Sequence, residues 1–182
     1  GSAPDFSGVM KAVGVLRVGS DWNWVQSNTI PEIQAADFTD KVTIAGESYY
    51  KVAVSIPFED TVGANDASGW NGSVAFADAV TDTVSQVTVQ FAGYQCNYSG
   101  TIAIANARLE NVEGSGGVQS EVVKEWTFDD GIGGWEDAGW NHQYNGAKPT
   151  TAADNGMLRV DVDYSKDGAV SWSQLGVREW GD

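Results

Sequence analysis

The chain has 182 residues, of which 42% are apolar, and its 25 acidic and 10 basic side chains give a formal net charge of −15. This length suits one domain with one core, which buries about 70% of the surface exposed in the unfolded chain. Because the negative charge repels phosphate backbones and anionic lipid headgroups, nucleic acids and membrane surfaces are poor partners for this chain.

Segments that alternate apolar and polar residues, as half-buried β-strands do, dominate the chain. In chain order they are residues 9–18, 41–46, 50–58, 73–80, 84–93, 101–112, 122–128, 157–164 and 169–177. No segment has a sustained helical period, although residues 31–38 (PEIQAADF) are expected to form one helical turn.

Asn-Gly and Asp-Gly pairs separate many of these segments and tolerate the positive φ angles of tight turns. They are Asn71-Gly72, Asp130-Gly131, Asn145-Gly146, Asn155-Gly156 and Asp167-Gly168. Short strands joined by such turns predict an all-β fold, a two-sheet antiparallel β-sandwich or jelly roll.

Several kinds of chemistry have no support in the sequence. Cys96 is the only cysteine and His142 the only histidine, so an intrachain disulfide is excluded and a packed thiol is expected at Cys96. No G-x-S-x-G elbow, phosphate-binding glycine motif or H-E-x-x-H pair occurs. No apolar run is long enough to span a membrane and no signal peptide pattern is present, so we expect a soluble, trimmed chain that begins with an expression remnant, Gly1-Ser2.

The chain has eight tryptophans, and their surroundings differ. Trp126 lies in a strand pattern and is expected in the core, whereas Trp22 and Trp24 flank one residue and would share one face of a strand. Trp172 has hydroxyl and amide neighbours, and Trp140 lies in the polar, turn-rich stretch EDAGWNHQYNG. Trp140 is either a ring folded back onto the core or a flat ring held out for a ligand.

Exposed aromatic rings beside amides and hydroxyls suit a neutral sugar polymer. The C–H faces of pyranose rings lie flat on an aromatic platform, while amide, carboxylate and guanidinium groups bind the hydroxyls. A tryptophan offers this area at a small cost in conformational entropy. A high acidic charge does not disfavour an uncharged ligand.

Five segments together resemble the strand succession of carbohydrate-binding modules, most closely the mannan-binding family 27 modules of bacterial mannanases. They are EWTFDDGIGGWEDAGW, NGMLRVDVDY, WSQLGVRE, WNWVQSN and GTIAIANARLENV. The resemblance implies a secreted bacterial module without catalytic activity. It also implies binding to plant cell-wall mannan, glucomannan or galactomannan, and attachment to the catalytic domain of a glycoside hydrolase.

The order of these segments differs from that of the family. The family's closing strand lies at residues 100–112 and its opening segment at 121–135, on either side of the linker EGSGGVQS. We therefore predict a circular permutant: one domain over residues 1–182, with the native C-terminal part at 3–112, a linker at 113–120 and the native N-terminal part at 121–182. In that case the segments that end at Asp182 and begin at Ala3 would join as a continuous strand, turn and strand. Chain ends on opposite sides of the molecule would contradict this prediction. The alternative is a fragment cut across two tandem modules.

The resemblance also implies the ligand-binding residues. Trp140, Trp172 and Trp24 match the family's sugar-facing tryptophans, and Trp135, next to Trp140, is either a further platform or a structural ring at the end of the sandwich. The full predicted set is Trp22, Trp24, Gln26, Trp135, Trp140, Asn141, Trp172 and Gln174.

Many of these modules hold a structural calcium through oxygen ligands near the chain ends. The family's terminal strand usually carries an aspartate where this chain has Ala105, and this loss counts against the site. The candidate calcium ligands that remain are Asp129, Asp130, Asp154 and Asp161. The alternative is that these acids form a solvated face.

Two other functions compete with sugar binding. A small jelly-roll glycoside hydrolase would use two carboxylates across a cleft, with Glu59, Glu136 and Glu179 as the candidates. The third possibility is an adhesive or structural sandwich without sugar specificity.

Overall fold

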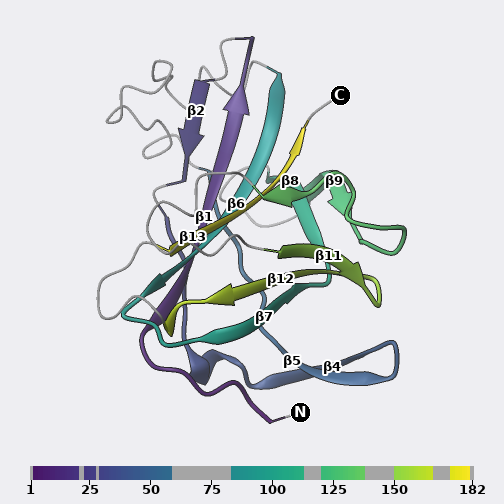
Figure 1. Ribbon diagram of the computed structural model, residues 1–182. Helices are drawn as coiled ribbons and strands as arrows, with labels where there is room; N and C mark the ends of the chain where they lie inside the picture. Colours follow the sequence, from purple (N-terminus) through teal and green to yellow (C-terminus); the bar gives the residue numbers. More distant parts are fainter. Residues whose placement is uncertain are drawn as a thin grey trace.

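The computed structural model describes residues 2–20, 23–27, 29–58, 83–112, 120–137, 150–165 and 173–180. These residues are nearly all in β-strands and their connections, so the predicted all-β class is confirmed (Figure 1). Within them, no helix is long and apolar enough to cross a membrane. The strands are β1 (Val9–Val18), β2 (Asn23–Gln26), β3 (Glu32–Ile33), β4 (Asp40–Ile44), β5 (Glu47–Lys51), β6 (Val84–Tyr94), β7 (Ser99–Ile104), β8 (Ala107–Val112), β9 (Ser120–Trp126), β10 (Glu136–Asp137), β11 (Thr150–Asp154), β12 (Met157–Asp163) and β13 (Ser173–Trp180).

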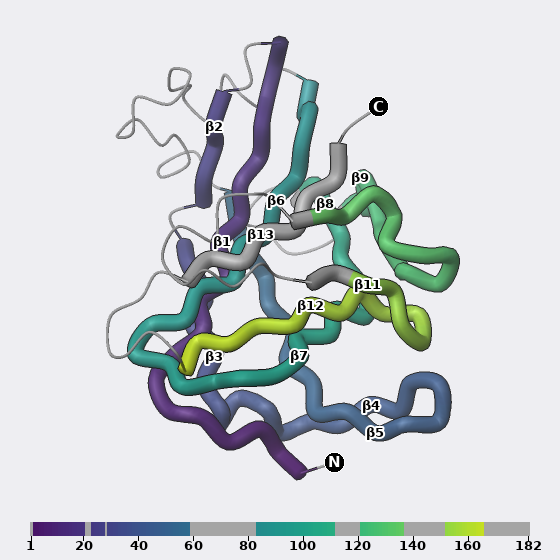
Figure 2. Tube along the Cα trace, viewed as in Figure 1, coloured from purple at the N-terminus to yellow at the C-terminus, as the bar shows by residue number. Residues whose placement is uncertain are grey.

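Among the described strands, the largest sheet has the order β10-β13-β6-β1-β2, with β3 also paired to β1. A three-stranded sheet has the order β11-β12-β7, and two ribbons are formed by β4-β5 and β8-β9. All of these pairings are antiparallel. Figure 2 shows β12 and β7 running across the direction of β1 and β6, as two layers of strands do.

The buried apolar side chains gather in three clusters. One buried cluster contains Trp126, Trp135 and Leu158, and packs against Val89 and Phe91 of β6. A second cluster joins Met10 of β1 to Phe6, Cys96 and Tyr164, and a third joins Leu16 and Val25 to Phe58. Cys96 is therefore the buried, free thiol that the sequence predicts.

The strand prediction for residues 50–58 is mostly wrong. Strand β5 ends at Lys51, and the following segment covers the core face of β1, where a Cβ built on Gly14 would lie 2.8 Å from Cγ2 of Ile56. The Ser27 hydroxyl holds this segment in place by donating a hydrogen bond to the Pro57 carbonyl at 2.5 Å. Proline has no N–H for a strand ladder, so Pro57 favours the irregular path.

Other local predictions have mixed outcomes. The expected strand 101–112 is divided into β7 and β8, and the one predicted helical turn is a 3-10 helix over Ala35–Asp37. The Asn155-Gly156 turn is confirmed, with φ angles of 53° and 73° between β11 and β12. The expected strand 73–80 lies outside the described residues.

The parts of the chain before and after the predicted linker form one folded unit. Strand β12 pairs with β7, and β13 pairs with β6, so each main sheet takes strands from both parts. Residues on either side of the linker, such as Phe91 and Trp126, meet in one hydrophobic cluster. The linker itself connects β8 to β9, which pair as neighbours.

The described ends of β13 and β1 lie far from each other. Strands β1 and β13 both run antiparallel to β6 and hence parallel to each other. Val9 lies opposite Tyr94, while Trp180 lies opposite Gln86; strand geometry places these ends of β6 about 27 Å apart. Figure 1 shows the N-terminal segment and the end of β13 on opposite sides of the molecule. A tight turn cannot join these two strand ends, which counts against the predicted junction. Residues 181 and 182 lie outside the described residues, so the permutation stays a prediction.

Candidate ligand-binding face

One face of the large sheet carries polar and aromatic side chains. In antiparallel sheets, residues directly opposite each other point to the same side. Arg17 of β1 lies opposite both Trp24 of β2 and Gln86 of β6, and Val15 lies opposite both Gln26 and Thr88. We call this side the polar face, defined by Arg17, Trp24, Gln26, Gln86, Thr88 and Gln90. Its reverse is the core face.

Trp24 is held by contacts to its ring and to its indole nitrogen. The guanidinium carbon of Arg17 lies 4.4 Å from the centroid of the Trp24 ring. The indole Nε1–H donates to Oε1 of Gln26 at 3.2 Å. Arg17 is only 8% exposed, and this burial lowers its pKa from the ordinary value. A cation over an indole face contributes about 0.5–2 kcal/mol, more as the site loses water.

Strand β6 supplies a row of amide and hydroxyl groups to this face. Gln86, Thr88 and Gln90 are all buried, and Gln86 Nε2 donates to Thr88 Oγ1 at 3.1 Å. Burying an amide costs free energy unless its hydrogen bonds are replaced, so a packing role alone would favour valine at these positions. Amide and hydroxyl groups offer both donors and acceptors to a polyhydroxylated ligand.

A second aromatic residue lies at the other end of β6. Tyr94 belongs to the same alternating set of β6 positions and is 44% exposed. Lys11 Nζ lies 5.2 Å from the centroid of its ring, and Lys11 also pairs with Glu32 at 3.1 Å.

The structure brings some of the predicted ligand-binding residues together. Trp24 and Gln26 contact each other on the polar face, and the register places position 174 on the same face, opposite Ala92. Trp22, Trp140, Asn141 and Trp172 lie outside the described residues.

Trp135 is not a ligand platform, and its alternative role as a structural ring is the one that the structure supports. It is 1% exposed, and its ring centroid lies 5.3 Å from that of Trp126 in an edge-on arrangement. Gly133 and Gly134 adopt positive φ angles of 57° and 80°, which turn the chain so that this indole enters the core. In the part of the chain that the structure describes, the indole N–H groups of Trp126 and Trp135 are buried without an acceptor.

Sequence reasoning missed most of the polar face. Arg17, Gln86, Thr88, Gln90 and Tyr94 were not among the predicted site residues, although they lie beside Trp24 or continue its face. The segment VSQVTVQFAGY contained the signal, because its polar positions alternate with the core residues Val87, Val89 and Phe91.

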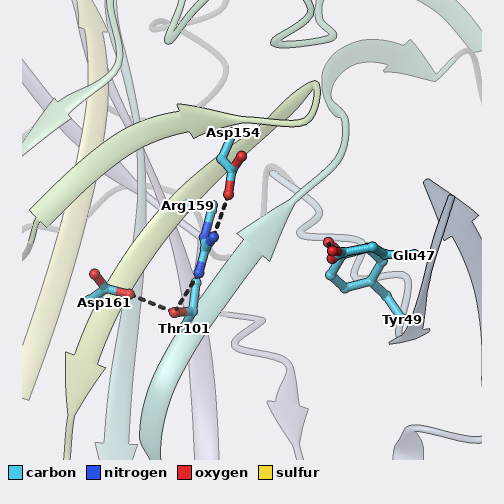
Figure 3. A network of polar contacts seen from close by, with 6 residues as sticks. All are labelled: Glu47, Tyr49, Thr101, Asp154, Arg159 and Asp161. Carbon is cyan, nitrogen blue, oxygen red and sulfur yellow. Dashed lines mark hydrogen bonds and ion pairs between the residues drawn. The ribbon is translucent and has the colours of Figure 1, made fainter. Parts of the chain in front are cut away.

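The four predicted calcium ligands do not form one site. Figure 3 shows Arg159 between Asp154, with which it forms an ion pair, and Thr101, whose hydroxyl donates to Asp161 at 2.5 Å. The hydrogen bond to Asp154 raises the pKa of Arg159, so a cation of the protein itself already lies between these acids.

The other two predicted ligands, Asp129 and Asp130, follow β9. Over the described residues, no three His, Cys, Asp or Glu side chains are placed to hold a metal ion. The calcium that the family resemblance implies gains no support from these side chains and stays a prediction.

On the opposite side of the same close-up, Tyr49 donates a hydrogen bond to Glu47 at 2.7 Å, which raises the pKa of Tyr49 (Figure 3). These two side chains belong to the β4-β5 ribbon and are not part of the polar face.

Two of the three candidate catalytic carboxylates belong to the neighbouring strands β10 and β13. Glu136 lies opposite position 178, whereas position 179 lies opposite Val87. Positions 136 and 179 are therefore not direct partners in the register. Glu59 lies outside the described residues.

Comparisons with known proteins add no information about this face. No protein-family model matches the chain, and no curated protein and no solved structure matches it.

Proposed function

We propose that the protein is a non-catalytic carbohydrate-binding module that binds soluble β-1,4-mannan-type polysaccharides on its polar face. The observation that carries the proposal is the arrangement of Trp24, whose ring is stacked on Arg17 and whose nitrogen is bonded to Gln26. Such a ring is a flat apolar surface with its polar atom already bonded, which matches the C–H face of a sugar ring.

Gln26 beside this ring is only partly buried, and its amide NH2 can donate to a sugar hydroxyl, which supports an uncharged, hydroxyl-rich ligand. In the proposed setting, the module is secreted by a bacterium and carried by a glycoside hydrolase catalytic domain, whose plant cell-wall substrate it holds.

Affinity electrophoresis against soluble glucomannan, galactomannan, mannan, xylan and a mixed-linkage glucan tests this function. We expect the mannose-containing polymers to retard the protein and a reducing-sugar assay on the same polymers to stay at background. Replacing Trp24 by alanine should abolish most of the retardation. The matched control is Tyr50→Ala, which removes a ring stacked on Lys41 at 4.5 Å in the separate β4-β5 ribbon.

Normal migration in all five polymers would remove the proposal. Release of reducing sugar would instead support the hydrolase, and a glycan array without any bound sugar would favour the adhesive or structural sandwich.

A further inference from the structure

We infer that Arg17 is the positioning residue of the sugar platform: it stacks on the Trp24 ring and fixes the orientation of that ring before the ligand binds. This inference rests on the proposed function, because it specifies how the same site is held ready. It assigns a role to a residue that does not itself touch the sugar.

The position of Trp24 explains why such support is needed. Strand β2 is four residues long, and among the described strands it pairs only with β1. A tryptophan on a short edge strand keeps freedom about its two side-chain torsions unless neighbours fix them. A platform that must be ordered on binding loses part of its affinity to that ordering.

Arg17 and Gln26 together fix these torsions. Arg17 is the direct cross-strand partner of Trp24, so its planar guanidinium at 4.4 Å sets which way the indole face is turned. Gln26 lies two residues further along the same face, and its bond to Nε1 at 3.2 Å sets the tilt of the ring within that plane. Trp24 is thereby held in one orientation before a ligand arrives.

The burial of Arg17 distinguishes positioning from direct sugar binding. At 8% exposure its side chain lies beneath the platform, whereas Trp24 and Gln26 are only partly buried. The stem of an arginine packs along apolar surface while its flat head stacks on the ring, which lysine reproduces only in part because its ammonium is a point charge.

The test compares Arg17→Met, Arg17→Lys and the matched control Lys41→Met, which removes a similar cation from the ring of Tyr50. Binding of mannohexaose is measured by titration calorimetry, and the indole N–H resonance of Trp24, assigned with Trp24→Phe, is followed without sugar.

We expect Arg17→Met to weaken binding about 3- to 10-fold, the loss that corresponds to ordering one large side chain, and to broaden or shift the Trp24 resonance. Arg17→Lys should recover part of both effects, and Lys41→Met should match the unsubstituted protein.

The outcomes distinguish a failure of this inference from a failure of the proposed function. If the unsubstituted protein binds none of the mannose-containing ligands, the proposed function fails, while the resonance of Trp24 still tests the support by Arg17. If mannohexaose binds equally well to Arg17→Met, only the inference is wrong. Weakened binding with an unchanged indole resonance would mean that Arg17 contacts the sugar, which also overturns it.

Should Arg17→Met fail to fold, Arg17→Lys tests the inference by itself. It keeps the charge and much of the stem but removes the planar group that stacks on the indole, and we expect weaker binding together with a shifted Trp24 resonance. Unchanged affinity and an unchanged resonance in that variant would overturn the inference.

Discussion

Truncating a platform tryptophan and a core tryptophan should have opposite consequences. Trp126 is 8% exposed and packs edge-on against Trp135, with their ring centroids 5.3 Å apart. Removing such a ring leaves a cavity and costs about 3–5 kcal/mol. At about 2–4 °C per kcal/mol for a chain of this size, Trp126→Ala should lower the thermal midpoint by roughly 10 °C.

Trp24 should behave in the reverse way. It is only partly buried, and the loss of its stacking on the Arg17 guanidinium should cost about 1 kcal/mol of stability in Trp24→Ala. Stacking of a flat ligand ring on an aromatic is worth about 1–3 kcal/mol by analogy with nucleobases, so sugar affinity should fall about 5- to 150-fold.

Scanning calorimetry and titration with mannohexaose, applied to both variants, provide the comparison. The folded fraction of Trp126→Ala should bind with nearly native affinity. If Trp24→Ala instead lowers the midpoint as much as Trp126→Ala and its folded fraction binds sugar normally, Trp24 is a structural ring and the reasoning from the polar face is refuted.

Further outcomes follow from other contacts. Gly14→Ala should destabilise the protein by about 1–3 kcal/mol in urea unfolding, because its Cβ would lie 2.8 Å from Ile56, whereas a neutral effect would show that the covering segment moves easily. Burial raises the pKa of Tyr164 above its ordinary value of 10.0, so this group favours folding below pH 10 and progressively less above it; the midpoint should fall in alkali, and less steeply in Tyr164→Phe. That substitution should itself cost about 1 kcal/mol, since the phenol donates to the Phe91 carbonyl at 2.9 Å. Chelator should leave the midpoint unchanged, because the predicted calcium ligands do not converge on one site, and a drop would reveal a bound ion. Sugar affinity should vary little between low and moderate salt, and a steep salt slope would indicate a charged ligand.

The strands with the clearest alternation were the most predictable. Residues 9–18 and 84–93 closely match β1 and β6. In each strand, one of the two alternating sets of side chains must face the core, and this requirement fixes the strand. The same pattern in residues 50–58 failed after Lys51, because this segment covers the core face of β1 instead of joining a ladder.

The candidate site was less predictable because it depends on which strands become neighbours. Trp24 and Gln26 were chosen from their local sequence, and the structure joins them by a hydrogen bond. Arg17 was not among the predicted site residues. Only the pairing of β1 with β2 and β6 shows that it lies beside Trp24 and Gln86. Trp135 could not be assigned from sequence, because a tryptophan that follows two glycines fits both a displayed ring and one turned inward.

The position of β13 beside β6 has a consequence for folding during synthesis. Strand β6 obtains its first neighbour early, because β1 precedes it in the chain. Its other neighbour, β13 (Ser173–Trp180), is made only after β7 to β12. Until those residues leave the ribosome, the backbone groups along that edge of β6 lack the partner that β13 provides, and such an edge can pair with another chain. Closing a contact between positions so far apart in sequence is slow. The step most exposed to aggregation is therefore expected to be the docking of β13, and deletion of Ser173–Trp180 should affect solubility during expression before it affects the strands already formed.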